Sequence, residues 1–133
     1  MSLVKLTNLP DLGDDRGGLV AIEESQTIPF PIKRVYYIYG TKSGTARGFH
    51  AHKALQQVAI CIAGKCNMLL DDGNNRDTVE LGSPNSAVAI EPMVWHEMHD
   101  FTDDCVLLVL ASDHYDENDY IRDYDAFLTL VKQ

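Results

Sequence analysis

Two histidines separated by a single residue, His50 and His52, form the most chemically suggestive pair in the chain. Side chains alternate between the two faces of a β-strand, so a strand over this segment points both imidazoles to the same side. Their Cα atoms then lie about 6.6 Å apart, which allows the pair to bracket one small ligand or one metal ion. Imidazole titrates close to neutral pH, so the pair suits acid–base chemistry or metal binding.

A simpler interpretation of this pair is two hydrogen-bonded polar residues at the edge of a sheet. The neighbouring cations Arg47 and Lys53 favour a functional site instead. The spacing points the same way, because five residues separate Gly44 from His50, four separate His52 from Gln57, and six separate Gln57 from Gly64. This pattern resembles the first sequence motif of the cupin superfamily, in which a glutamate occupies the position of Gln57.

A second cupin motif supplies another histidine from a later strand, and His96 in the segment EPMVWHEM is the candidate. Here the proline is present, the usual glycine is missing, and the spacing is one residue short. Two histidines, a carboxylate and a third histidine make a good site for a divalent metal. Because Gln57 replaces that carboxylate with a neutral amide, we expect a pocket without metal or other cofactor. Metal binding stays open as an alternative, since three histidines alone can hold zinc.

Short apolar segments bounded by Gly, Asn and Asp recur along the chain, as expected for strands of a sandwich or barrel. We therefore predict an all-β fold, a cupin-type jelly-roll barrel, as one domain over residues 1–133. The expected strands, besides those that carry the histidines, are Leu19–Glu23, Val35–Tyr39, Gln57–Ala63, Cys66–Leu70, Thr78–Leu81, Ala87–Ile90 and Val106–Ala111.

One helix is expected near the C-terminus, where apolar residues follow a helical period and make one face. These residues are Tyr120, Ile121, Tyr124, Phe127, Leu128 and Val131. We expect this face to pack on the barrel or on a partner.

The chain is acidic, with 11 Lys and Arg against 20 Asp and Glu, a formal net charge of −9. Such a balance argues against a broad nucleic-acid-binding surface. The sequence shows neither a secretory signal nor an apolar run long enough for a membrane span. An odd number of cysteines, Cys61, Cys66 and Cys105, indicates buried free thiols in a reducing compartment, so we expect a cytoplasmic protein.

The segments DRGG, RGFHAHK, VWHEMHDF and DYIRDYDAF together resemble the bacterial dTDP-4-oxo-6-deoxyglucose 3,4-ketoisomerases, and the likeness runs from about Leu6 to Leu130. The resemblance implies a small cupin that forms a homodimer by exchanging N-terminal strands. It also implies a metal-free isomerisation of a dTDP-linked 4-keto-6-deoxy sugar, in the synthesis of deoxyamino sugars for surface polysaccharides. The two histidines of the family correspond to His50 and His52.

In this reaction a base removes the proton at sugar C3, and a proton is returned to C4 of an enediol-like intermediate. We expect His52 to be the base, with His50 as proton donor or as the group that holds the enediol oxygens. Hydrogen-bond donors must stabilise the developing oxyanion, and Tyr37, Arg16 and His96 are the further candidates.

The diphosphate of such a substrate requires cations, which guanidinium groups supply in a bidentate geometry. The sugar itself is expected near Arg16 and His96, with a product of galacto configuration favoured by the resemblance. The remaining expected binding residues are Arg34, Arg47, Lys53, Arg122, Gln57 and, for stacking on thymine, Trp95 or Tyr39. His99 and His114 carry no spacing argument and are expected to be structural or on the surface.

Three alternatives remain at this point. A metal-dependent cupin enzyme would use His50, His52, Gln57 and His96. A sugar-nucleotide 3,5-epimerase resembles the ketoisomerases in fold, but it pairs its catalytic histidine with an aspartate and usually has a longer chain. A non-catalytic nucleotide-sugar binding module would keep the basic residues and would not need two histidines that converge on the sugar.

Overall fold

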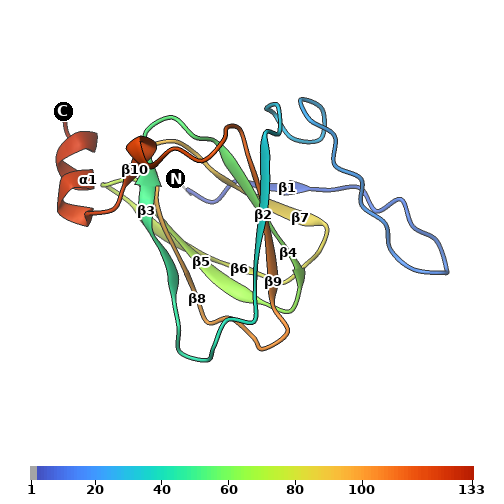
Figure 1. The fold of residues 1–133 in the computed structure, drawn as a ribbon. Coiled ribbons are helices and arrows are strands. Elements are labelled where there is room, and N and C mark those ends of the chain that lie inside the picture. Colours follow the sequence, from blue (N-terminus) through green and yellow to red (C-terminus); the bar gives the residue numbers. More distant parts are fainter. Residues whose placement is uncertain (1–2) are drawn as a thin grey trace.

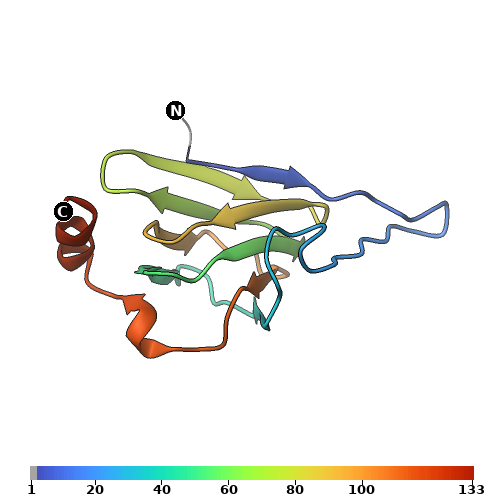
Figure 2. The same cartoon turned by 90° about the horizontal axis from the view of Figure 1, so that it is seen from above.

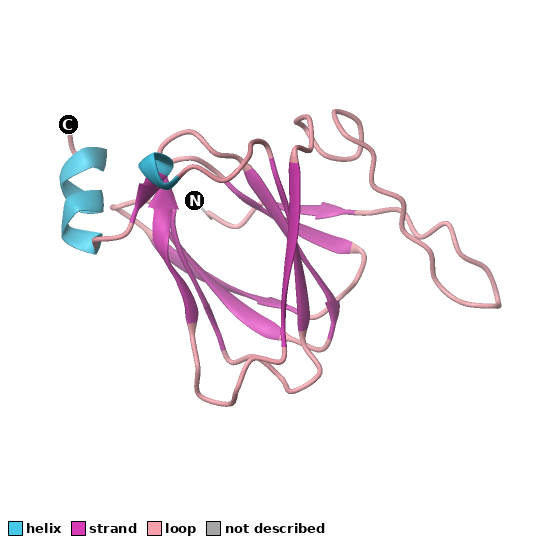
Figure 3. Ribbon diagram, viewed as in Figure 1, coloured by secondary structure: helices cyan, strands magenta, loops and turns pink. Residues whose placement is uncertain are grey.

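The computed structural model describes residues 3–133 and is built almost entirely from β-strands (Figure 3). Within that range lie ten strands, one short 3-10 helix (η1, Glu117–Asp119) and one α-helix (α1, Tyr124–Val131). The strands are β1 (Leu6–Asn8), β2 (Arg34–Tyr39), β3 (Arg47–His52), β4 (Gln57–Ala63), β5 (Cys66–Asp71), β6 (Arg76–Leu81), β7 (Ser86–Ile90), β8 (Trp95–His99), β9 (Val106–Ala111) and β10 (Tyr120–Ile121). In this same range, no helix is long and apolar enough to cross a membrane.

The strands form two five-stranded antiparallel sheets, with the orders β1-β7-β4-β9-β2 and β10-β3-β8-β5-β6. The sheets lie on opposite sides of the core, as Figures 1 and 2 show in two views. Buried residues from both sheets fill this core, among them Met68 of β5 and Leu107 of β9. This arrangement confirms the predicted all-β, cupin-type jelly roll with a C-terminal helix.

The strand that carries the histidine pair contains an irregularity. Its pairing with β8 shifts register between Gly48 and His50, so one extra residue is inserted as a β-bulge. Gly48 has a positive φ of 93°, and a Cβ at this position would meet the carbonyl oxygen of His96 at 2.9 Å. Phe49 also has a positive φ, 62°, which a residue with a large side chain rarely adopts. The bulge places His50 directly opposite His96 on the neighbouring strand.

The C-terminal segment differs from the predicted helix at its start. Tyr120 and Ile121 form strand β10, which pairs with His52 and Ala51 of β3, and the helix begins only at Tyr124. Hydrogen bonding to a sheet edge therefore overrides the local helical periodicity over these residues. The helix buries Phe127 against Trp95, Ala51 and Ile121, which confirms the prediction that it packs on the barrel.

The prediction of a strand at Leu19–Glu23 is wrong, because this range has no strand in the structure. Residues 9–33 form a long irregular arm, and its first half extends away from the barrel (Figure 1, blue). Within the arm, the Leu12 N–H donates a hydrogen bond to the Leu19 carbonyl, and both side chains are exposed. Leu9, Ile28 and Phe30 anchor its two ends by packing against Val58 and other residues of the first sheet.

Candidate active site

The three predicted histidines meet inside one end of the barrel. The ring of His50 lies 5.0 Å from that of His52 and 4.5 Å from that of His96, between ring centroids. His52 and His96 are 2% and 1% exposed, and His50 is half-buried. The two histidines of β3 therefore share one face, as strand alternation predicted, and the bulge brings the third against them.

Each of these imidazoles directs its Nδ1 atom at an oxygen that accepts hydrogen bonds. The partners are the Gly48 carbonyl for His50 at 3.1 Å, the Asp119 carboxylate for His52 at 3.2 Å, and the Val94 carbonyl for His96 at 3.3 Å. An imidazole bonded this way carries its proton on Nδ1, so its neutral form has a free electron pair on Nε2. Three basic nitrogens are thus prepared to accept a proton.

The surroundings keep these histidines neutral at physiological pH. Burial lowers the pKa of His50, and it lowers that of His52 to about 4 against the opposing effect of Asp119. Burial also lowers the pKa of His96 to about 3. Neutral imidazole is the form that removes a proton from carbon, so the site is ready to act as a base.

A hollow of about 500 Å³ opens in front of His50, between β2 and β3. Arg34, Arg47 and Arg122 line it, and its lining includes no Asp or Glu. Apolar and aromatic surface comes from Tyr36, Tyr37, Ile38, Phe49, Met98 and Tyr120. In a chain with a net charge of −9, this local cluster of arginines makes a site for an anionic ligand.

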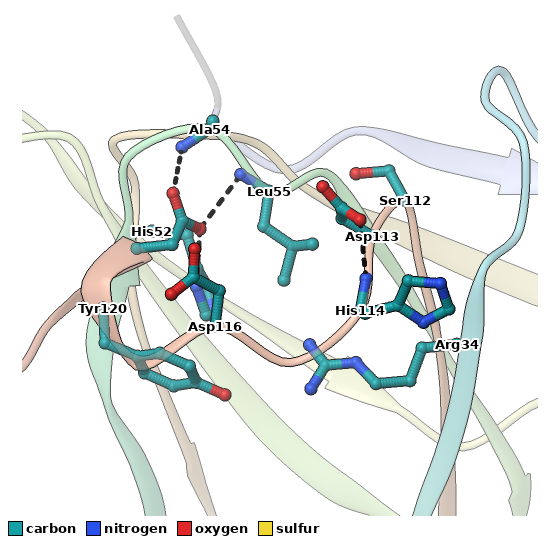
Figure 4. A pocket seen from close by; sticks show the side chains of 10 residues that line it. Arg34, His52, Ala54, Leu55, Ser112, Asp113, His114, Asp116 and Tyr120 are labelled. Carbon is teal, nitrogen blue, oxygen red and sulfur yellow. Dashed lines mark hydrogen bonds and ion pairs between the residues drawn. The ribbon is translucent and has the colours of Figure 1, made fainter.

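A second hollow, of about 170 Å³, adjoins the first and shares Arg34 and Tyr120 with it. The rest of its lining is His52, Ala54, Leu55, Ser112, Asp113, His114, Asp116 and Asp119 (Figure 4). The guanidinium of Arg34 extends into this space in the figure, and its Nε is buried without a hydrogen-bond partner among the described residues. A buried donor without a partner is costly, so this group is suited to a ligand that accepts hydrogen bonds.

Tyrosines of β2 alternate between the two sides of the strand, which bears on the predicted role of Tyr37. Its side chain is 61% exposed and lines the larger hollow together with Tyr36, which is half-buried. The Tyr36 hydroxyl donates a hydrogen bond of 2.7 Å to the amide oxygen of Gln57. Gln57 as a residue is 2% exposed. Burial raises the pKa of Tyr36 to about 12, so its phenol stays protonated.

The other predicted binding residues are only partly brought together. Arg122 lies over the ring of Tyr120 and forms an ion pair with Glu117. Lys53 is exposed and lines neither hollow.

Three further predicted residues lie away from the two hollows within the described chain. Arg16 sits on the projecting arm, where it pairs with Asp14. Trp95 is 3% exposed and packs against Tyr124 and Phe127, so its position indicates support for the helix rather than stacking on a base. Tyr39 is 70% exposed and lies on the outer face of β2.

Two groups of side chains could hold a metal among the residues that the structure describes. They are His50, His52 and His96, and the cysteines Cys61, Cys66 and Cys105, each with ligand atoms within 4.8 Å of one another. In the histidine group, the Gln57 amide replaces the anionic ligand of metal-binding cupins, and its oxygen already accepts the bond from Tyr36. The donor set is therefore three neutral imidazoles.

Sequence reasoning missed Tyr36, Asp119 and Tyr120. Strand parity could have identified Tyr36, because Arg34 was expected to face the ligand and a residue two positions on shares its side. Nothing local identifies Asp119, which lies 67 residues from His52 and meets it through the pairing of β10 with β3. A histidine–aspartate pair was the feature expected of the epimerase alternative, and His52 and Asp119 form such a pair here.

Comparisons with known proteins show the family of the chain. The family model described as WxcM-like, C-terminal (FdtA) matches residues 2–132. The TDP-4-oxo-6-deoxy-α-D-glucose-3,4-oxoisomerase of Aneurinibacillus thermoaerophilus is 58% identical over 123 residues, which are 92% of this chain and 88% of that protein.

Solved structures of sugar 3,4-ketoisomerases have the same fold as this chain. A 3,4-ketoisomerase from Helicobacter canadensis is 47% identical, with a TM-score of 0.95 and complete coverage of both chains. The sugar 3,4-ketoisomerase QdtA from Thermoanaerobacterium thermosaccharolyticum, in complex with TDP, is 46% identical, with a TM-score of 0.95 over 97% of this chain and 94% of that one. The chain therefore belongs to the FdtA, WxcM-like family of sugar 3,4-ketoisomerases.

Proposed function

We propose that this protein is an isomerase that converts dTDP-4-oxo-6-deoxyglucose into the corresponding 3-oxo sugar. The observation that carries the proposal is the hollow of about 500 Å³ that places three arginines and His50 around one space with no acidic lining. Its volume suits a nucleotide-linked sugar, since small-molecule sites usually measure about 300–1,000 Å³. The similarity to TDP-sugar ketoisomerases supports this substrate class.

Arg34, Arg47 and Arg122 bind the diphosphate in this proposal. Guanidinium groups bind phosphate oxygens through paired, charge-assisted hydrogen bonds, which are about twice as strong as neutral ones. Arg34 stands between the two hollows and has a buried Nε without a partner in the described chain, so it is the group with most to gain from the ligand.

His52 removes the proton from sugar C3 through its Nε2 atom, and the C4 carbonyl becomes the oxygen of an enediolate. A proton then adds to C4, the C3 hydroxyl loses its proton, the C4 oxygen gains one, and the ketone lies at C3, so no atom is gained or lost. His50 faces the larger hollow and transfers protons to or from the enediol oxygens. Its Nε2 electron pair fits it to take the proton of the C3 hydroxyl.

No step of this mechanism needs a metal or another cofactor. Proton transfer next to a ketone requires an unprotonated base and donors for the oxyanion, and both are present in these side chains. The phenol of Tyr120 lies in contact with both histidines of β3, with ring centroids 4.9 Å from His50 and 4.4 Å from His52. It is the donor that we place nearest to the developing charge, in addition to Arg34.

The test is to incubate chelator-treated protein with dTDP-4-oxo-6-deoxyglucose in deuterated water and to follow the sugar by NMR. We expect a 3-oxo product that carries solvent deuterium at C4, with the galacto configuration. A gluco product would contradict the configuration alone. Activity that appears only after a divalent metal is added would favour the metal-dependent cupin, and tight TDP binding without turnover would favour a binding module.

We also propose that the protein acts in the cytoplasm as a homodimer that exchanges N-terminal strands. β2 lies at the edge of its sheet and exposes Val35, Tyr37 and Tyr39 on its outer face. An apolar row beside an open strand edge is a surface that proteins usually cover. In an exchanged dimer the projecting arm would carry Arg16 to the partner's pocket, which accounts for its place outside the pocket of its own chain.

The dimer proposal is tested by sedimentation equilibrium of the wild type and of a Tyr37→Asp variant. We expect a mass of twice 14.8 kDa for the wild type and a shift toward the monomer in the variant, because a charge in an apolar interface is costly. A wild type that stays monomeric at every concentration would contradict the proposal.

A further inference from the structure

Asp119 closes the turn η1 and stands against the end of β3 that carries His52. Its carboxylate accepts hydrogen bonds from the His52 Nδ1 at 3.2 Å and from the backbone N–H groups of Ala54 at 2.8 Å and Leu55 at 3.2 Å. Its own carbonyl oxygen accepts a bond of 3.0 Å from the backbone N–H of Lys53. The two dashed lines at Ala54 and Leu55 in Figure 4 mark the backbone bonds. The turn after the histidine strand is therefore built around this one side chain.

These bonds hold the carboxylate rigidly against the Nδ1 atom of the His52 ring. Two backbone donors fix its position, so it holds the imidazole in one orientation and on one tautomer. Asp119 is itself mostly covered, with 18% of its side chain exposed, so water weakens its interaction with His52 little. The Nε2 atom is left with a free electron pair in the neutral ring.

The three histidines differ in this respect. His50 and His96 donate their Nδ1 protons to backbone carbonyls, which orient a ring and carry no net charge. Only His52, among these three, donates to a carboxylate. A carboxylate stabilises the imidazolium that forms when the ring takes up a proton, because a hydrogen bond between two charged groups is stronger than one to a neutral carbonyl. The geometry therefore gives His52, alone among these three rings, a charged acceptor for its Nδ1–H group.

We propose that Asp119 is a positioning residue of the isomerase, which holds His52 on its Nδ1–H tautomer and stabilises the imidazolium formed during proton abstraction. This inference rests on the proposed function and goes beyond it by identifying which histidine is the base. Asp119 does not touch the substrate in this role and acts through His52.

The experiment replaces Asp119 with asparagine. The amide keeps one oxygen, which can retain the backbone bond from Ala54, while its NH2 group replaces the oxygen that faces Leu55 and His52, and the charge is lost. The matched control is Asp123→Asn, because Asp123 caps α1 by accepting a bond from the Asp125 N–H and an asparagine caps a helix equally well. Asp119→Glu is the conservative variant, which retains a carboxylate.

We expect Asp119→Asn to lower kcat between roughly 10²- and 10⁴-fold, with KM and the Kd for TDP changed less than about threefold. The control should keep wild-type kcat, and Asp119→Glu should recover part of the loss. A role limited to holding the turn would instead appear as a lower unfolding temperature, with kcat preserved in the folded fraction.

Nitrogen-15 NMR of histidine-labelled protein supplies a readout that does not depend on turnover. In the wild type we expect the His52 proton on Nδ1, and in Asp119→Asn a shift of that proton toward Nε2. The pKa of His52 should fall in the variant. Other groups that face the ring, namely His50, His96, Arg34 and Tyr120, are unchanged by the substitution.

The outcomes separate this inference from the proposed function. A wild type without 3,4-isomerisation would overturn the function, while the tautomer measurement would still decide whether Asp119 controls His52. If Asp119→Asn is folded, keeps kcat within twofold and leaves the tautomer unchanged, the inference is wrong. Should that variant not fold, Asp119→Glu decides: an unchanged tautomer with partial kcat supports the inference, and a tautomer on Nε2 with wild-type kcat overturns it.

Discussion

The chain contains two compact triads of potential ligands, and their difference shows what makes a functional site. His50, His52 and His96 form one, and Cys61, Cys66 and Cys105 form the other; in each the ligand atoms lie within 4.8 Å of one another. Both are largely buried, and proximity alone does not distinguish them.

The two triads differ in access and in partners. The histidines adjoin hollows lined by arginines, and each has a hydrogen-bond acceptor that leaves its second nitrogen free. The cysteines lie deep in the core, where the Cys61 thiol donates to the Ala63 carbonyl and its sulfur lies 3.6 Å from that of Cys105. They line neither of the two hollows beside the histidines.

Burial also shifts the two chemistries in opposite ways. It lowers the pKa of the histidines and leaves a neutral base ready to react, while it raises the pKa of Cys61 to about 12 and keeps an unreactive thiol. The same desolvation therefore keeps the histidines as neutral bases and the cysteines as protonated, unreactive thiols. The predictions below test that contrast.

The largest expected effect comes from His52→Asn. Removal of the general base should lower kcat between about 10²- and 10⁴-fold, while the Kd for TDP changes less than about threefold because the arginines remain. Steady-state kinetics and calorimetric titration with TDP measure the two quantities. His99→Asn is the control, since His99 pairs with Glu97 and lines neither hollow. Near-normal turnover of His52→Asn would contradict the assignment of the base.

A smaller effect is expected when Arg34 is replaced by glutamine. The loss of a charge-assisted contact to the diphosphate should cost about 1.5–3 kcal/mol, which is roughly a 10- to 150-fold rise in the Kd for TDP. Lys33→Gln is a matched control, because the neighbouring residue removes the same charge and its side chain is exposed near Asp113. Equal affinities of the two variants for TDP in calorimetric titrations would show that the net charge of the protein, and not a specific contact from Arg34, determines nucleotide binding.

The pH dependence should be modest near neutrality. The histidine pKa values are lowered in the folded protein, so the rings lose their protons below the ordinary value of about 6.5. The neutral base is therefore fully available above pH 6.5, and kcat/KM should fall only as the pH drops further, toward the lowered pKa. A profile of kcat/KM from pH 4.5 to 8 measures this, and an acid limb at or above 6.5 would contradict the neutral state of the site.

The smallest effect on activity is expected at the cysteines. Iodoacetamide should leave the native thiols unmodified and turnover unchanged, and mass spectrometry detects any adduct. Cys105→Ala should keep kcat within about twofold and lower the free energy of unfolding by about 1 kcal/mol, because it deletes a small buried group. A large fall in kcat from this variant would indicate that the cysteine triad is functional.

Much of this site follows from local rules. Strand alternation placed His50 and His52 on one face, and the cupin spacing added His96 from a distant strand. The same rule also identifies Tyr36, because it shares with Arg34 the half-buried side of β2, while Tyr37 stays a prediction. The helix was predicted too long because the apolar pattern from Tyr120 suits both a helix face and the buried edge strand β10.

The sequence by itself determined the residue types and their local periods: an all-β barrel, a histidine pair on one strand face, and a cluster of arginines near it. Only the tertiary structure decided which side chains meet. The bulge at Gly48 and Phe49 brings His50 against His96, and the pairing of β10 with β3 brings Asp119 to His52. These contacts join segments far apart in the chain, and they depend on sheet register, which no local pattern of residues specifies.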